Sequence, residues 1–195
     1  MVEDFVDILI QNNALEEKYR EDSIYWLTIS LEKIVACTVL FGISFLLGKF
    51  IEGIVFVVCF LMLRRTTGGF HAKTFLSCLI GSITTVILVL EILSSLAEKH
   101  VILFGLMIII SIVCILVFAP VNHPNLMLTL EEQKKHRYWS RWVLFIEIGI
   151  AGVSCILQMK WQYYIMMAII ICAVFIIVAK LLRQEVKMDE GKEDK

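Results

Sequence analysis

Long apolar runs dominate this chain of 195 residues and limit what it can fold into. A run of roughly 17–25 apolar residues is long enough to cross the roughly 30 Å hydrocarbon core of a bilayer as an α-helix. With 59% hydrophobic and only 19% charged residues, the chain lacks the polar surface that a soluble domain needs. The sequence therefore predicts an all-α integral membrane protein.

Six segments are expected to cross the membrane as helices. Their approximate bounds are Trp26–Leu47, Phe50–Leu63, Phe75–Leu96, Val101–Ala119, Trp142–Leu157 and Trp161–Leu182. The second segment is short, because it rises only about 21 Å at about 1.5 Å per residue. A diglycine, Gly68-Gly69, follows it. We therefore expect a short second helix and then an irregular loop at the inner membrane edge, where the backbone must be buried in protein or line a wet cavity.

Lysine and arginine are concentrated in alternate loops, which fixes the expected orientation. The loops at 64–74 and 120–141 and the tail after 183 are basic, whereas the remaining loops carry only Lys49, Lys99 and Lys160. Both chain ends are therefore expected in the cytoplasm.

Three regions follow from this pattern. Residues 1–24 form an N-terminal segment whose apolar side chains favour one helical face, so it lies either on the inner leaflet or free in the cytoplasm. Residues 25–183 form the six-helix transmembrane domain. Residues 184–195 form a charged tail that is expected to be disordered. Within the loop at 120–141, Thr129 and Glu132 match a capping box, which predicts that a basic helix starts there and runs into the fifth span.

Several functional classes are disfavoured by composition. The formal net charge is −1, so no global basic excess points to nucleic acid. The 6 cysteines show no C-x-x-C spacing, which argues against a disulfide scaffold or a zinc site. We therefore expect no metal, no cofactor and no nucleic-acid partner.

His71 and Cys78 are the residues with the clearest chemical potential. A cysteine nucleophile needs a base or an imidazolium partner to form thiolate near neutral pH. On one continuous helix the two would stand about 10.5 Å apart, too far for a hydrogen bond, so His71 must lie in the loop and fold over the helix start. Thr74 is placed to cap that helix, whose dipole then favours a thiolate. The alternative is that Cys78 merely fills space and His71 is solvated.

These residues resemble the signature of the AgrB family, accessory gene regulator B. The matching positions are Arg64, Gly68-Gly69-Phe70-His71-Ala72, Cys78 seven residues after the histidine, and the segment Ala119-Pro120-Val121-Asn122-His123-Pro124-Asn125 in a form that looks clostridial. Chain size, six spans and cytoplasmic ends also agree, so the resemblance covers nearly the whole chain.

The resemblance implies a membrane cysteine endopeptidase of bacterial quorum sensing, acting as a homodimer in the cell membrane with its active site facing the cytoplasm. It implies that Cys78 is the nucleophile and His71 its general base and acid. The substrate would be an AgrD-type propeptide, which loses its C-terminal part and leaves a thioester on Cys78. An internal cysteine or serine of the peptide would then close a thiolactone or lactone ring, the autoinducer.

Further site residues follow from the same resemblance. Arg64, Gly68 and Gly69 would bind substrate or support the site, although Arg64 is equally explained as an anchor at the cytoplasmic membrane face. The basic residues expected to steer the acidic part of the propeptide are Lys134, Lys135 and Arg137, together with Arg141. A topology signal explains these four equally well.

A third catalytic residue is not evident from the sequence. The candidates for orienting His71 or lining the oxyanion site are Ser77, Asn122, His123 and Glu147. Glu147 lies within the fifth expected span, so it either faces the site or reaches the membrane interface, and we favour the interface. Two other functions remain open, a peptide exporter without catalysis and a membrane scaffold.

Overall fold

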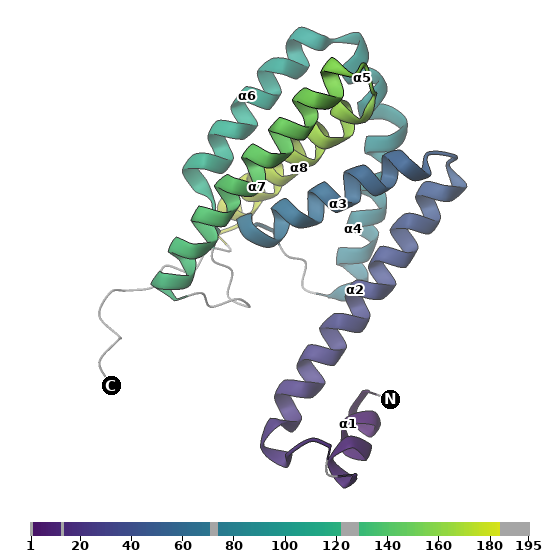
Figure 1. Cartoon of the computed structure of the whole chain (residues 1–195), viewed down its shortest axis with the longest axis vertical. Helices are drawn as coiled ribbons and strands as arrows, with labels where there is room; N and C mark the ends of the chain where they lie inside the picture. The colour runs from purple at the N-terminus through teal and green to yellow at the C-terminus, as the bar shows by residue number, and fades with distance from the viewer. Residues whose placement is uncertain (1, 13, 71–73, 122–128, 184–195) are drawn as a thin grey trace.

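A computed structural model describes residues 2–12, 14–70, 74–121 and 129–183 (Figure 1). Over these residues the chain is helical: α1 Val2–Gln11, α2 Arg20–Leu46, α3 Phe50–Thr67, α4 Phe75–Ile87, α5 Ser94–Lys99, α6 Val101–Phe118, α7 Leu130–Ile156 and α8 Trp161–Leu181. A 3-10 turn, η1, covers Glu17–Tyr19, and a π-helical segment, η2, covers Leu88–Leu93 and joins α4 to α5. The expected all-α class is confirmed.

Five helical segments within the described residues are long and apolar enough to cross a membrane. Their bounds are Glu17–Leu46, Phe75–Lys99, Val101–Phe118, Leu130–Ile156 and Trp161–Leu181. The chain is therefore a multi-pass membrane protein. The expected second span, α3, differs from these five because Glu52, Arg64 and Arg65 stand among its 18 residues. A sixth crossing stays a prediction.

The predicted end of the second span at Leu63 is wrong. Helix α3 continues to Thr67, so it rises about 27 Å and is not short. It ends where Gly68 takes a positive φ of 67°, a conformation that stops a helix and that glycine adopts without steric cost. Polar residues after an apolar run do not end a helix by themselves, which is why the hydropathy pattern placed the end too early.

Helix α8 is the central element of the bundle, and it packs against α3, α6 and α7. Its buried face carries many small side chains, among them Ala168, Cys172, Ala173 and Ala179. Lipid chains are as apolar as leucine, so close backbone approach through small residues is what holds membrane helices together. Helix α2, by contrast, is mostly exposed and extends away from this core toward the N-terminus (Figure 1).

The N-terminal segment forms the expected helix. Helix α1 folds back on α2, where Val6 is fully buried and Arg20 donates two hydrogen bonds, of 2.7 and 3.1 Å, to the Asp7 carboxylate. The Arg20 guanidinium holds the pKa of Asp7 below its ordinary value. Phe5 and Ile8 remain exposed, and their residence on the inner leaflet stays a prediction.

Helix α7 begins as the sequence predicts. The Thr129 hydroxyl accepts a hydrogen bond from the Glu132 backbone N–H at 3.3 Å, and Glu132 accepts one from the Thr129 N–H at 2.9 Å. From this capping box the helix runs without interruption to Ile156. In Figure 1, the start of α7, the start of α4 and the C-terminal end of α8 are the lower ends of their helices. The lower side of the bundle in this view is the side expected to face the cytoplasm.

Candidate functional site

The end of α3 leads into a fixed elbow of three residues, Gly68, Gly69 and Phe70. Gly68 pairs in parallel with Val121, and the Val121 N–H donates a hydrogen bond of 2.9 Å to the carbonyl of Thr67. The Phe70 N–H donates a hydrogen bond of 3.0 Å to the carbonyl of Phe175 in α8. The elbow is thus attached to two segments far away in the chain.

Both glycines of the elbow are required by its geometry. Gly68 and Gly69 have φ values of 67° and 117°, which residues with a side chain rarely adopt. A Cβ on Gly68 would collide with the carbonyl oxygen of Val121. A Cβ on Gly69 would collide with the Arg64 guanidinium and would lie 3.3 Å from the carbonyl oxygen of Phe175. The diglycine therefore provides close packing as well as the bend.

Arg64 occupies the inside of this elbow. Its guanidinium donates hydrogen bonds to the carbonyls of Gly68 and Phe70, and its charged carbon stands 5.1 Å from the centre of the Phe175 ring. A charge-assisted bond to each carbonyl and a cation–π contact together fix both the arginine and the loop. In this arrangement the Arg64 side chain is turned toward the elbow and α8 and supports the elbow.

Helix α4 begins at Phe75, five residues after the end of the elbow, with Thr74 as its N-cap. The Thr74 hydroxyl accepts a hydrogen bond from the Ser77 N–H at 3.3 Å and lies 2.8 Å from the Ser77 hydroxyl. The predicted cap is thus confirmed, and Ser77 is engaged in it. Cys78 follows, its N–H bonded to the Thr74 carbonyl at 3.1 Å and its side chain exposed.

His71 and Lys73 lie outside the described residues, as do Asn122 and His123. The pairing of His71 with Cys78 accordingly stays a prediction, and so does any role of Asn122 or His123.

Glu147 does not lie where the sequence argument favoured. It is buried, with 3% of its surface exposed, so the preference for the membrane interface is wrong. It belongs to a buried stripe of α7, which packs against α3 and α8. Neither of its carboxylate oxygens has a hydrogen-bond partner among the described residues. Hydropathy alone cannot distinguish a helix face turned to protein from one turned to lipid.

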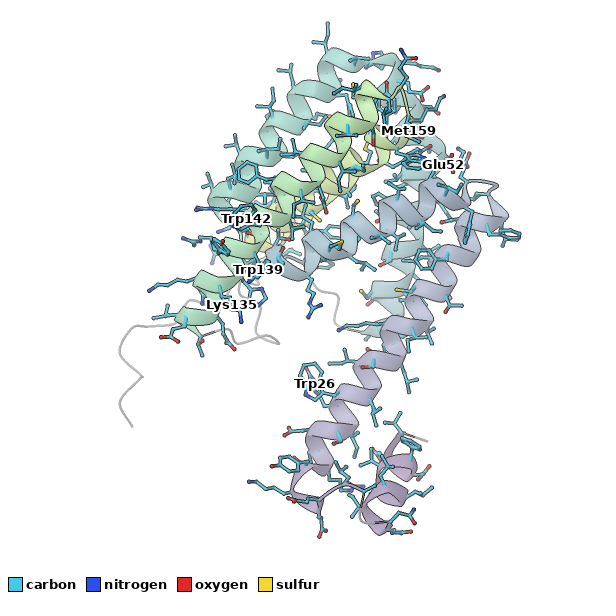
Figure 2. All side chains as sticks on the ribbon, in the orientation of Figure 1. Trp26, Glu52, Lys135, Trp139, Trp142 and Met159 are labelled. Carbon is cyan, nitrogen blue, oxygen red and sulfur yellow. The ribbon has the colours of Figure 1, made fainter. Side chains whose placement is uncertain are left out.

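Lys134, Lys135 and Arg137 are exposed on the first turns of α7, before the helix enters the bundle at buried Ser140. Figure 2 shows Lys135 near the free lower end of this helix. These side chains form a basic surface on the side expected to face the cytoplasm.

Phe175 is the main contributor to the elbow that the sequence did not suggest. Its carbonyl and its ring both contact the elbow, yet it looks like any apolar residue of a membrane helix. Val121 had a signal, since it belongs to the Ala119–Asn125 segment that resembles the family. The structure brings Val121 against Gly68, although more than fifty positions separate the two residues in the chain.

Comparison with known proteins agrees with these observations. The family model for AgrB, accessory gene regulator B, matches residues 2–180, a range that includes the elbow and Cys78. A putative AgrB-like protein of Listeria innocua serovar 6a is 28% identical over 136 residues, which are 68% of this chain and 66% of that protein. This chain thus spans slightly less than two thirds of the relative's length. No solved structure matches it. On the extent of the family match, the chain belongs to the AgrB family.

Proposed function

We propose that this protein is a membrane-embedded cysteine endopeptidase that removes the C-terminal part of an AgrD-type propeptide. One observation carries the proposal: Cys78 is exposed at the start of α4, directly beyond an elbow that Arg64 fixes against α8. A nucleophile that must meet a peptide needs both exposure and a rigid surround.

In the first chemical step His71 removes the proton from the Cys78 thiol. The thiolate attacks the scissile carbonyl carbon, the C–N bond breaks, and His71 returns the proton to the leaving amine. The C-terminal fragment departs with a free amino group, and the rest of the propeptide stays on Cys78 as a thioester.

In the second step an internal cysteine or serine of the propeptide attacks this thioester. Its proton passes through His71 to Cys78, which is regenerated as a thiol, and the peptide leaves as a thiolactone or lactone. Thioester exchange with a thiol is nearly balanced in energy, so the ring-closing step itself does not need ATP. Hydrolysis competes with ring closure, and a site at the membrane edge that excludes water would favour the ring.

The elbow gives the proposed dyad a fixed base. Phe70, the residue before His71, is held by the Arg64 side chain and by the Phe175 carbonyl. A catalytic group on a rigid mount approaches its reactive geometry without first losing conformational freedom. This accounts for the arginine and the two glycines that precede the histidine in the motif.

The basic surface of α7 fits a substrate with an acidic C-terminal part. Lys134, Lys135 and Arg137 are exposed, so their positive field reaches an approaching peptide. The attraction would be screened by salt, because the Debye length is about 8 Å at physiological ionic strength.

The test is mass spectrometry of the protein in liposomes, incubated with its propeptide. We expect a released C-terminal fragment and a peptide adduct on Cys78, both lost in Cys78→Ala. Cys155→Ala is the matched control, because Cys155 is also exposed but lies near the far end of α7. His71→Ala should abolish the adduct while leaving membrane insertion intact.

Cleavage by the Cys78→Ala protein would refute the proposed chemistry. If the propeptide instead stays intact with every variant but enters sealed vesicles, the protein is an exporter.

A further inference from the structure

The helical segment that carries Cys78 near one end changes its geometry partway along. Helix α4 ends at Ile87, and η2, which follows it, is π-helical until α5 begins at Ser94. The Ser94 N–H accordingly bonds to the carbonyl of Val89, five residues earlier. A π-helical turn is rare, often lies at a functional site, and is one of the places where a helix bends sharply. The segment thus has a bending point about 15 Å from Cys78 along the helix axis.

Beyond this bending point the segment is held on several sides. Lys49, in the turn between α2 and α3, donates a hydrogen bond to the carbonyl of Leu90 and forms an ion pair of 3.1 Å with Glu91. Leu90 itself is fully buried, and η2 packs against α8. Lys160 forms a second ion pair of 3.1 Å, with Glu98 of α5, and α5 packs against both α6 and α8. The part of the segment after the bending point is therefore attached to the bundle.

Helix α4, on the other side of the bending point, is attached less firmly. It packs mainly against α2, and none of its residues from Phe75 to Thr85 is buried. Interhelical hydrogen bonds are one of the interactions that hold membrane helices together. The hydroxyls of Ser82, Thr84 and Thr85 instead each donate to a carbonyl one turn earlier in α4 itself. Their hydrogens are thus not used to bind α4 to a neighbouring helix.

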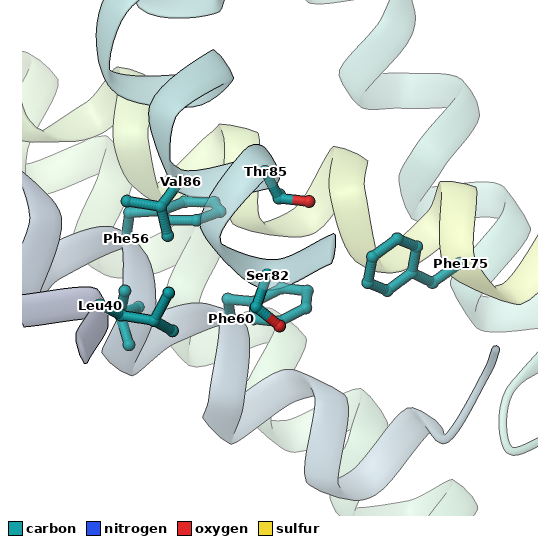
Figure 3. A pocket seen from close by; sticks show the side chains of 8 residues that line it. Leu40, Phe56, Phe60, Ser82, Thr85, Val86 and Phe175 are labelled. Atoms are coloured by element: carbon teal, nitrogen blue, oxygen red, sulfur yellow. The ribbon is translucent and has the colours of Figure 1, made fainter. Parts of the chain in front are cut away.

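A narrow gap separates α4 from α3 and α8 (Figure 3). Ser82 and Thr85 line it on α4, together with Phe60 of α3 and Phe175 of α8. Its volume of about 10 Å³ is room for about one water molecule, which is too small for a ligand. Side chains that border a void lose dispersion contacts on that side. Helix α4 can therefore leave this position with little loss of packing energy.

We propose that α4 is an arm that pivots at η2 and carries Cys78 toward the elbow and away from it. The arm is about 15 Å long, so a tilt of about 20° at the hinge moves the thiol by about 5 Å. A movement of this size decides whether two groups are within the roughly 3 Å of a hydrogen bond. The elbow is bonded to α8 through Phe70 and Phe175, so the tilt changes the distance between the elbow and Cys78.

The use of this movement in cleavage rests on the proposed function. A propeptide that contacts both the elbow and Cys78 binds better when the two are close. It therefore shifts the population toward the position of α4 nearer the elbow, which we call closed. The thiol then meets its base only when a substrate is in place, which limits side reactions of a free thiolate.

The experiment measures distances between two spin labels on the protein in lipid nanodiscs, in a background whose native cysteines are replaced by alanine. The arm pair joins Leu76→Cys at the start of α4 to Leu181→Cys at the end of α8. The control pair joins Val117→Cys, near the end of α6, to the same site on α8. All three sites are exposed, and α6 packs against α8. In the protein alone we expect a broad distance distribution for the arm pair and a narrow one for the control pair.

Bound propeptide should shorten the arm-pair distance by about 5 Å and leave the control pair unchanged. Because this background lacks Cys78, the propeptide binds without being cleaved. Lys49→Met removes the ammonium group that holds η2, so it should broaden the arm-pair distribution further. Lys160→Met is the matched control, since it also removes a lysine–glutamate ion pair, but on α5 rather than at the hinge. It should leave the arm-pair distribution as it was.

An arm-pair distribution as narrow as that of the control pair, both in the free protein and with propeptide bound, would overturn the hinge whatever the cleavage assay shows. A broad distribution that bound propeptide does not shift would overturn its use in cleavage. A moving arm in a protein that forms no Cys78 adduct would refute the proposed function and leave the hinge standing. The failures are therefore distinguishable.

Discussion

At the scale of single residues, the site depends on groups that support a loop. Arg64 donates to two carbonyls of the elbow and stacks on Phe175, so its charge and its planar shape are both used. A lysine has the charge but cannot bridge two carbonyls with a planar fork. The motif arginine and the motif glycines therefore act as one unit.

Gly69→Ala should disrupt this unit. The added methyl group meets the Arg64 guanidinium at a backbone φ of 117°, which together should cost about 1–3 kcal/mol and strongly reduce propeptide cleavage. Gly149→Ala is the control, because a Cβ there meets no atom within 4 Å. Thermal unfolding in detergent and the cleavage assay measure the two effects. Normal cleavage by Gly69→Ala would mean that the elbow is not needed in this form.

At the scale of elements, α7 has two different surfaces along its length. Its first turns are basic and exposed, whereas its later turns bury one stripe that contains Glu147, Leu144 and Ala151. A carboxyl group in such a stripe is costly unless a partner satisfies it.

Glu147→Leu should stabilise the folded protein by about 1–3 kcal/mol, because it removes a buried polar group to which no described residue bonds. Glu131→Leu, on the exposed first turn of the same helix, should change stability by no more than about 0.5 kcal/mol. Thermal unfolding of both variants in one detergent gives the comparison. A loss of stability in Glu147→Leu would show instead that the carboxyl group has a partner beyond the described residues.

At the scale of the whole molecule, the two exposed cysteines report the orientation. Cys78 is near the start of α4 and Cys155 near the end of α7, so the predicted topology places them on opposite sides of the membrane. In right-side-out vesicles an impermeant maleimide should label a variant that keeps only Cys155. It should label one that keeps only Cys78 after the vesicles are inverted. The reverse pattern would contradict cytoplasmic chain ends.

Local sequence features were enough to predict the membrane helices and two of the helix caps. Apolar run length indicated the membrane helices, because a bilayer imposes a minimum length on every span. The caps at Thr74 and Thr129 were predicted because capping depends on side chains within three residues. The pairing of His71 with Cys78 was suggested by residue type and spacing, and it stays a prediction.

The tertiary structure decided which segments far apart in the sequence contact one another. It placed Val121 against Gly68, Phe175 against Arg64 and Phe70, and Glu147 inside the bundle. None of these contacts leaves a periodic or local signal, since lipid and protein interior are equally apolar to a hydropathy pattern. The sequence by itself determined which segments are helices in a membrane. Packing among them decided which residues hold the elbow and which carboxyl group is buried inside the bundle.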